Sequence, residues 1–224
     1  MTDVLITTYQ RFDTINQVCT AWLNVVGIGK VWLLDGSGGD AKPYLSTCAS
    51  SERFLYWPMP FDPQTRSDMC IGQLADSDLV VLADDDVMPD PSLLHAMEET
   101  YKLTEGGMVG LIGRTFHGES YRQDTRFYSS HSSDRAVRVG FVGVVQLVPR
   151  SLLFFDTRGM NRNCDDLWLC MREHPRIPKY VCPTRAFTNI KVKGMFHDAE
   201  LAAVRQDFYA KYWMLNYKPE GLSW

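Results

Sequence analysis

The first half of the chain alternates short apolar runs with stretches of helical spacing, and this alternation restricts the fold more than any other feature. The apolar runs lie at residues 3–9, 30–35, 53–57, 78–83 and 108–113. Helices are expected between them, at residues 13–26, 41–50 and 68–76 and from Pro91 to about residue 102. Strands that alternate with helices form parallel sheets covered on both faces. The sequence therefore predicts an α/β fold with a Rossmann-like, mostly parallel central sheet and helices on both faces.

Polar residues follow directly on several of the predicted strands. Thr8 and Asp35 close the first two, and the run "LADDDVMPDP" places Asp84, Asp85 and Asp86 at the end of the fourth. Ligands of such sheets bind beyond the carboxyl ends of the strands. Adjacent carboxylates repel one another by about 3 kcal/mol at ~5 Å and an effective dielectric of roughly 20, and a hard divalent cation would reverse this repulsion. In an extended chain Asp84 and Asp86 point to one side and Asp85 to the other; a solvated turn is the alternative interpretation.

Composition limits the class of protein. The chain has 224 residues, of which 45% are hydrophobic and 22% charged, and its formal charge is −4. This content supports a sizeable core, excludes a disordered chain and argues against a surface that grips nucleic acid over its whole area. No apolar run approaches the ~18 residues of a membrane span, and the start "MTDVLITTYQ" has no signal-peptide character. We therefore expect a cytoplasmic protein without integral membrane association, whose six cysteines are free thiols.

The pattern changes after residue 113. Residues 114–138 are polar and aromatic with no clear period, and they include five arginines. Long irregular segments inside compact domains are usually functional or mobile. Strand character returns at residues 139–149, and helices are expected at residues 165–174 and 199–215. Because no linker-like stretch divides the chain, the sequence predicts a single domain over residues 1–224 with a variable second half.

Six segments, taken in order, resemble family 2 glycosyltransferases, which have the GT-A fold. "VLITTYQR" is similar to their opening strand and loop, "VWLLDGSGG" to their second strand, and "DSDLVVLADDDVMPDP" to their DxD region. "GFVGVVQLVPRSLL" resembles a glycine-containing segment near the acceptor site, "NCDDLWLCMRE" the xED motif and its helix, and "GMFHD" a late histidine segment. The resemblance implies a GT-A domain with a nucleotide-sugar-binding half at residues 1–113 and an acceptor-binding half at residues 114–224.

On the donor side, the resemblance implies a pocket for the nucleotide sugar. Its expected residues are Thr8, Tyr9, Arg11, Asp35, Arg66, Asp84 and Asp85. Within this set, Asp35 would hydrogen-bond the base, Arg66 would approach the diphosphate, and Asp84 would contact the ribose or the metal's ligand shell. The role of Asp85 is left unassigned. Asp86 and His197 would bind Mn²⁺ or Mg²⁺, and a histidine ligand favours Mn²⁺. The alternative interpretations are that Asp35 is only a turn residue and that His197 is a surface or core histidine.

On the acceptor side, the resemblance implies that Asp166 is the catalytic base and that Gly143 and Asp165 lie near the acceptor. Asp165 stands where the family has a glutamate, and its shorter side chain leaves the role of that position open. Asp166 has an alternative interpretation as an acid favoured by the dipole at a helix N-terminus. A carboxylate base supports a single displacement, which inverts the anomeric centre.

The function implied by the resemblance is a metal-dependent, inverting glycosyltransferase with a UDP-sugar as the expected donor. The expected acceptor is a glycan, and a modified base in DNA and a protein side chain are further candidates. The arginines in residues 114–138 permit DNA, because they could contact its phosphates. One alternative is a sugar nucleotidyltransferase, which expects a glycine-rich loop where "TTYQRFDT" has no glycine. The other is a nucleotide-sugar or carbohydrate-binding protein without turnover, which the retained acidic triplet and the "CDD" acids argue against.

Overall fold

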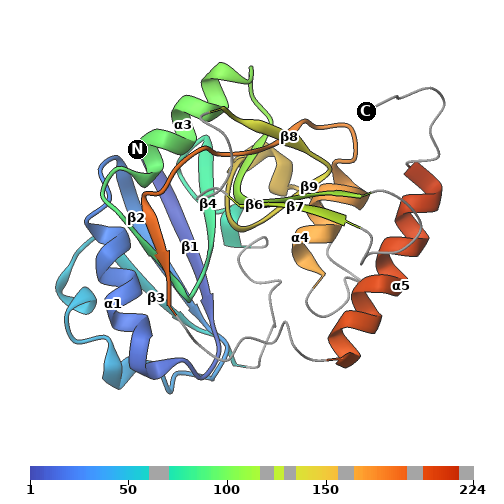
Figure 1. Cartoon of the computed structure of the whole chain (residues 1–224). Coiled ribbons are helices and arrows are strands. Elements are labelled where there is room, and N and C mark those ends of the chain that lie inside the picture. Colours follow the sequence, from blue (N-terminus) through green and yellow to red (C-terminus); the bar gives the residue numbers. More distant parts are fainter. Residues whose placement is uncertain (61–70, 117–123, 129–134, 156–163, 191–198, 217–224) are drawn as a thin grey trace.

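A computed structural model shows an α/β architecture in which helices flank a central mixed sheet (Figure 1). The structure describes residues 1–60, 71–116, 124–128, 135–155, 164–190 and 199–216, with side chains for all of these except 124–128, 199–202 and 213–216. Within the described residues, nine strands form one sheet of order β3-β2-β1-β4-β9-β6-β10-β8, with β7 paired to β6. The predicted α/β fold is therefore confirmed.

The four strands on one side of the sheet are parallel. They are β1 (Thr2–Thr8), β2 (Ile28–Asp35), β3 (Phe54–Pro58) and β4 (Leu79–Asp84). The helix α1 (Phe12–Leu23) joins β1 to β2, and the short 3-10 turns η1 (Lys42–Tyr44) and η2 (Cys48–Ser50) replace the helix predicted at residues 41–50. Thr8 pairs with Asp35, and Thr7 with Asp84, so the carboxyl ends of β1, β2 and β4 share one edge. The helix predicted at residues 68–76 begins outside the described residues.

The strand β9 (Phe141–Pro149) breaks the parallel order. It pairs antiparallel with β4 on one side and with β6 (Met108–Phe116) on the other. The remaining strands are β7 (Asp124–Tyr128), β8 (Val137–Val139) and β10 (Lys179–Val181), of which only β10 runs parallel to its neighbour β6. The sheet is therefore mixed, and the parallel prediction holds for its first half. The segment 114–138, predicted to be irregular, contributes the end of β6, β7 and the start of β8.

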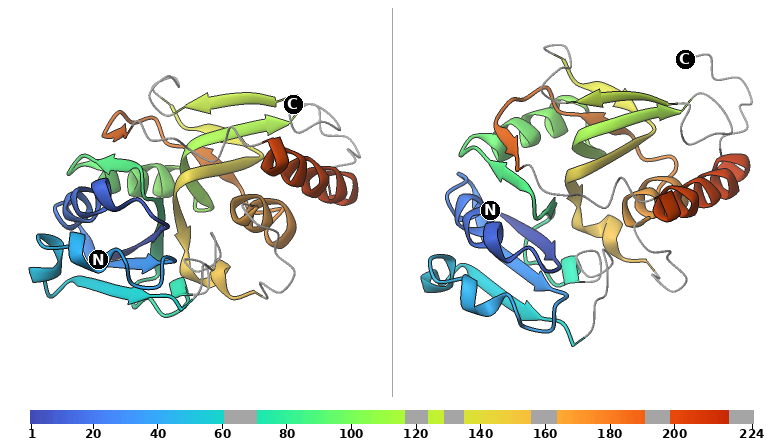
Figure 2. Two further views of the ribbon diagram at one scale, coloured as in Figure 1. Left: turned by 90° about the horizontal axis from the view of Figure 1, so that it is seen from below. Right: turned by 60° about the horizontal axis from the view of Figure 1, so that its bottom comes forward.

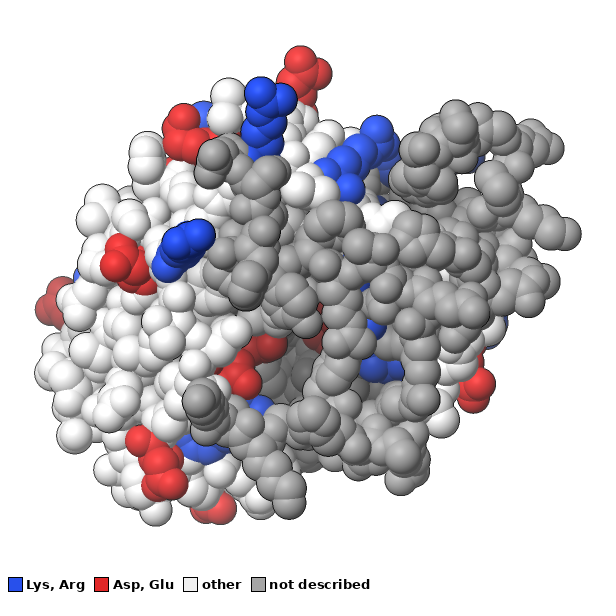
Figure 3. Space-filling model, in the orientation of Figure 1, with Lys and Arg blue, Asp and Glu red and all other residues white. Residues whose placement is uncertain are grey.

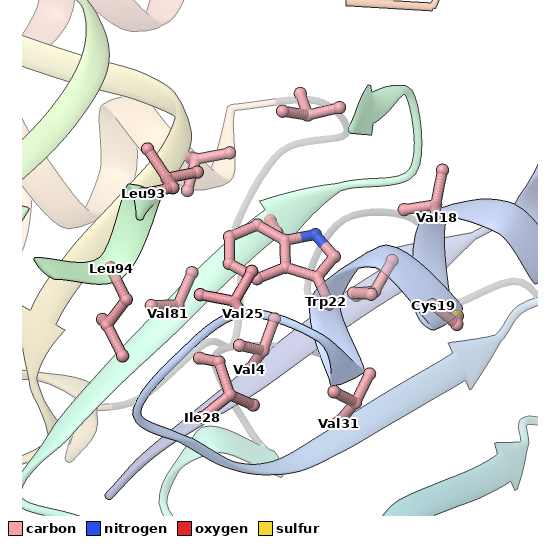
Figure 4. Close-up of a cluster of buried hydrophobic side chains, with 14 of the residues drawn as sticks. Val4, Val18, Cys19, Trp22, Val25, Ile28, Val31, Val81, Leu93 and Leu94 are labelled. Atoms are coloured by element: carbon pink, nitrogen blue, oxygen red, sulfur yellow. The ribbon is translucent and has the colours of Figure 1, made fainter. Parts of the chain in front are cut away.

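Helices α1 and α3 (Leu93–Leu103) cover one face of the sheet. They pack against a core cluster in which Trp22 lies among Val4, Val81 and Leu94 (Figure 4). Along β1, Val4 and Ile6 face this cluster, whereas Leu5 between them faces the core on the opposite side. Burial on both faces explains why the strand appears in the sequence as one continuous apolar run rather than as an alternating one.

The opposite face is covered by elements from the end of the chain. The short helix α4 (Asp165–Leu167) continues into a π-helical turn, η5 (Trp168–Glu173), and α5 (Ala199–Asn216) lies beside it (Figure 2). Trp168 and Phe208 stack across this contact with their ring centroids 5.8 Å apart. The prediction of helices on both faces is confirmed. No helix among the described residues is both long enough and apolar enough to cross a membrane.

A small second sheet lies beside the end of β4. The strand β5 (Val87–Pro89) follows the three aspartates after a turn and pairs antiparallel with β11 (Phe187–Asn189). The N–H of Ile190 donates to the carbonyl oxygen of Asp86 at 2.7 Å. This pairing brings a segment of the second half of the chain directly against the acidic triplet.

Candidate functional site

The acidic triplet does not continue as an extended strand. β4 ends at Asp84, and a turn at Asp85 and Asp86 leads into β5. The turn directs both carboxylates toward Arg11, whose Nη1 atom lies 2.7 Å from Asp85 Oδ1 and 2.9 Å from Asp86 Oδ2. The expectation that Asp85 points away from Asp86 is therefore wrong, because it required an extended backbone through Asp86, whereas the strand ends at Asp84.

Asp85 is the inner member of the triplet. It is only 7% exposed, and its Oδ2 accepts a hydrogen bond from Thr8 Oγ1 at 2.8 Å. Burial raises the pKa of the Asp85 carboxyl to about 6, although Arg11 and the Thr8 hydroxyl both act to lower it. Thr8 and Arg11, which the sequence predicted to line a nucleotide pocket, thus meet Asp85 within one network. The structure gives Asp85 a definite set of partners that the sequence did not provide.

Asp84 connects the triplet with the predicted base. Its side chain is reached by solvent but surrounded by protein, and this desolvation raises its pKa well above the ordinary value. The carboxylates of Asp86, Asp165, Asp85 and Asp166 raise it further. Acidic groups from both halves of the chain therefore lie within electrostatic reach of one another. Figure 3 shows acidic and basic side chains around a hollow near the middle of one face of the molecule.

Backbone pairing supports this proximity independently. Ala83, the residue before Asp84, pairs with Val145 of β9, one strand spacing (~4.8 Å) away. Two residues before Val145, Gly143 lies against Asp166: a Cβ atom at Gly143 would be 3.3 Å from Asp166 Oδ2. Gly143 therefore permits a close approach between β9 and the predicted base. Its expected place near the acceptor side stays a prediction.

A bulge in β9 adjoins this approach. The pairing of β6 with β9 shifts between Gly110 and Ile112, which oppose Gln146 and Gly143, so β9 carries one extra residue there. Val144 has a φ of 72°, which is strained for a β-branched residue. Bulges redirect side chains and are over-represented beside active sites. This one separates the part of β9 that pairs with β4 from the part that contacts Asp166.

Asp166 is held by an arginine from α5. Arg205 Nη2 lies 3.0 Å from Asp166 Oδ2, and both side chains are largely buried. The backbone N–H of Leu167 donates to Asp166 Oδ1 at 2.7 Å. Asp165, beside it, is half-buried. Arg205 is not among the residues that the sequence predicted for the site, although its spacing with Tyr209 and Tyr212 on a predicted helix places all three on one face.

The Asp35 carboxylate is hydrogen-bonded by groups of the protein itself. It is fully buried, and its carboxylate accepts hydrogen bonds from the N–H and hydroxyl of Ser37, the N–H of Ala41 and the hydroxyl of Tyr56. These four donors match the approximately four lone-pair sites of a carboxylate. They also lower its pKa, against the effect of burial. The geometry thus favours the turn interpretation of Asp35, and its contact with a base stays a prediction.

The remaining predicted residues are placed unevenly. Tyr9 is 47% exposed at the end of β1. Arg66 and His197 lie outside the described residues. The described chain before His197 ends at Ile190, whose N–H is hydrogen-bonded to the carbonyl oxygen of Asp86.

Within the part of the chain that the structure describes, no three His, Cys, Asp or Glu side chains are grouped so as to hold a metal ion. No protein-family model and no curated protein matches the sequence significantly.

Proposed function

We propose that the protein is a metal-dependent, inverting glycosyltransferase of GT-A-like architecture that uses a nucleotide-diphosphate sugar, with a UDP-sugar as the expected donor. The observation that carries the proposal is that Asp84 lies within electrostatic reach of Asp85, Asp86, Asp165 and Asp166 at one edge of the sheet. Sugar transfer requires acidic groups of two kinds at one place. One kind binds the cation that neutralises the departing diphosphate, and the other takes the proton of the acceptor hydroxyl.

The described residues fit an open site for a hard divalent cation. Asp84 is exposed, and the side chain of Asp86 is 27% exposed, so both can offer carboxylate oxygens. Mg²⁺ and similar ions are commonly bound by one or two carboxylates together with substrate phosphates. A site of that kind needs no cage of three protein ligands. The proposal keeps His197 as a further ligand, which would favour Mn²⁺. When bound, the cation would neutralise charge on the leaving diphosphate.

Asp166 supplies the base in this proposal. The acceptor oxygen forms a bond to the anomeric carbon while the bond to the diphosphate breaks, and the hydroxyl proton passes to Asp166. Arg205 orients this carboxylate, and Gly143 leaves room beside it. On the donor side, Asp85 accepts a hydrogen bond from Thr8 and holds Arg11, which would bind the diphosphate. A glycan is the proposed acceptor, with a modified DNA base or a protein as alternatives.

A panel of nucleotide sugars with Mn²⁺ or Mg²⁺, read by thermal shift, tests donor binding because a ligand of the folded state raises the melting temperature. Release of nucleoside diphosphate with an acceptor panel then tests transfer. We expect Asp166→Asn to keep the donor shift while turnover falls by about 10²–10⁴-fold. We expect Asp86→Asn to lose the metal-dependent part of the shift.

Asp76→Asn is the matched control, because Asp76 is exposed and forms an ion pair with Lys30 at 2.6 Å, away from the acidic triplet in sequence. It should behave as the wild type in both assays. Wild-type turnover in Asp166→Asn, or the absence of any nucleotide-diphosphate shift, would contradict the proposal. Donor binding without transfer to any acceptor would favour the binding protein. Pyrophosphate release from a nucleoside triphosphate and a sugar 1-phosphate would favour the nucleotidyltransferase.

A further inference from the structure

Arg11 lies where a cation would be needed to relieve repulsion within the triplet. One nitrogen, Nη1, contacts a carboxylate oxygen of Asp85 and of Asp86, at 2.7 and 2.9 Å. The side chain comes from the loop after β1, where Gln10 has a φ of 57°. A left-handed residue at this point costs free energy and indicates a loop whose conformation the surrounding structure imposes. The guanidinium therefore occupies a defined position beside the carboxylates.

The two carboxylates held by Arg11 differ in their surroundings. The Asp85 side chain is 10% exposed and is bound by Thr8, whereas that of Asp86 is 27% exposed. Thr8 thus holds the Asp85 carboxylate in place, whereas the Asp86 carboxylate is more accessible to solvent. An incoming ligand can compete for Asp86 without opening the contact between Arg11 and Asp85.

We propose that Arg11 occupies the cation position on Asp86 in the absence of ligands, and that the divalent cation replaces it there when a nucleoside diphosphate binds. This inference rests on the proposed function. A divalent cation and a guanidinium on the same carboxylate repel each other, so Arg11 opposes binding of the metal alone. The diphosphate removes this opposition, because the planar guanidinium binds phosphate oxygens well and can transfer to them. Asp85 is then a positioning residue that retains Arg11 at the site throughout the exchange.

The consequence is positive coupling between the metal and the diphosphate. Each ligand must strengthen the binding of the other by the same factor. Removing Arg11 should therefore have opposite effects on the two affinities. Metal alone should bind more tightly, the diphosphate should bind more weakly, and the coupling between them should shrink.

The test measures free Mn²⁺ by electron paramagnetic resonance during titrations with and without UDP. The variants are wild type, Arg11→Met, Arg11→Lys and the control Lys30→Met, which removes a cation from the exposed pair with Asp76. In the wild type we expect UDP to tighten Mn²⁺ binding by about tenfold or more. In Arg11→Met we expect Mn²⁺ alone to bind about threefold more tightly than in the wild type, with weaker coupling. Lys30→Met should match the wild type.

If circular dichroism shows that Arg11→Met does not fold, Arg11→Lys is used instead to compare the coupling of Mn²⁺ and UDP binding with that of the wild type. A lysine keeps the charge but not the planar fork, so it should retain the opposition to metal alone and lose part of the coupling. Undiminished coupling in both variants, or Mn²⁺ alone binding no more tightly to a folded Arg11→Met, would overturn the inference and leave the proposed function intact. The absence of UDP-coupled Mn²⁺ binding in the wild type would overturn both.

Discussion

Two arginines hold the carboxylates of the candidate site, and they do so in different ways. Arg11 contacts two adjacent carboxylates, and its partner Asp85 is further bound by Thr8. Arg205 contacts one carboxylate, Asp166, from the helix α5. Thr8 closes β1 and Asp85 follows β4, and these two strands are hydrogen-bonded neighbours. The proposed donor side, around Arg11, therefore lies directly at the ends of two parallel strands, whereas the proposed acceptor side, around Asp166, depends on a helix docked against the sheet.

This difference predicts unequal tolerance to substitution. A network between adjacent strands has few ways to adjust, because strand register fixes the positions of its members. A helix on the surface can shift by a small amount when one contact is lost. Substitutions on the donor side should therefore cost more free energy of unfolding than matched substitutions on the acceptor side.

The largest effect is expected for Asp85→Ala. Arg11 and the Thr8 hydroxyl would lose a buried partner, and breaking a buried ion pair on one side costs about 3 kcal/mol of unfolding free energy. Urea denaturation measures this value. Asp76→Ala, in an exposed pair, is the control and should change stability little. A loss below about 1 kcal/mol for Asp85→Ala would mean that the pair behaves as a surface salt bridge.

A somewhat smaller effect is expected from pH. Burial raises the pKa of Asp85 from an ordinary 3.8 to about 6, so the folded protein binds this proton more tightly than the unfolded chain. The stabilising contribution of the protonated group is full below pH ~4 and is lost as the pH rises through about 6. We expect the free energy of unfolding of the wild type, relative to Asp85→Asn, to fall by about 2 kcal/mol across this window. A pH-independent difference between the two proteins would refute the shifted pKa.

On the acceptor side, Gly143→Ala should cost about 1–2 kcal/mol, as overpacking does in other cores. The added Cβ would lie 3.1 Å from the Phe141 ring and 3.3 Å from Asp166 Oδ2, so one of them must move. Gly140→Ala is the matched control, because its nearest atoms are at an ordinary 3.6 Å. Thermal melts measure both variants. Equal melting temperatures for Gly143→Ala and Gly140→Ala would show that the side chains around Gly143 move aside without a loss of stability.

The smallest effect is expected for Arg205→Met, at about 1 kcal/mol, because Asp166 keeps the hydrogen bond from the N–H of Leu167 when the contact with Arg205 is lost. A double-mutant cycle with Asp166→Asn isolates the interaction between the two side chains. A coupling energy larger than that of Arg11 with Asp85, measured in the same way, would reverse the proposed contrast between the two sides.

The sequence predicted best where local pattern determines structure. Continuous apolar runs located the parallel strands, and therefore the shared edge that carries Thr8 and Asp84. The sequence-based predictions failed where contacts between distant segments determine the position of a side chain. Nothing local reveals that the strand ends at Asp84, which turns Asp85 toward Arg11, or that Ser37 and Tyr56 occupy the Asp35 carboxylate.

The second half was less predictable for the same reason. In the polar segment 114–138, β7 pairs with the neighbouring end of β6, but β8 pairs with β10, where Val139 lies opposite Lys179. The partner of β8 is therefore not encoded in the local sequence. The bulge at Val144 depends on the register between β6 and β9, which no single segment encodes. Arg205 was overlooked although the helix that carries it was predicted, because its partner Asp166 is 39 residues away.

The insertion of β9 between β4 and β6 also has a consequence for the order of folding. The four parallel strands are complete once Asp84 has been synthesised, but the other edge of β4 has no partner until β9 emerges more than fifty residues later. An unpaired strand edge is a template for wrong pairing, and pairings of long sequence separation form slowly. A nascent or truncated chain that stops before Phe141 should therefore aggregate through β4, the strand that leads to the acidic triplet.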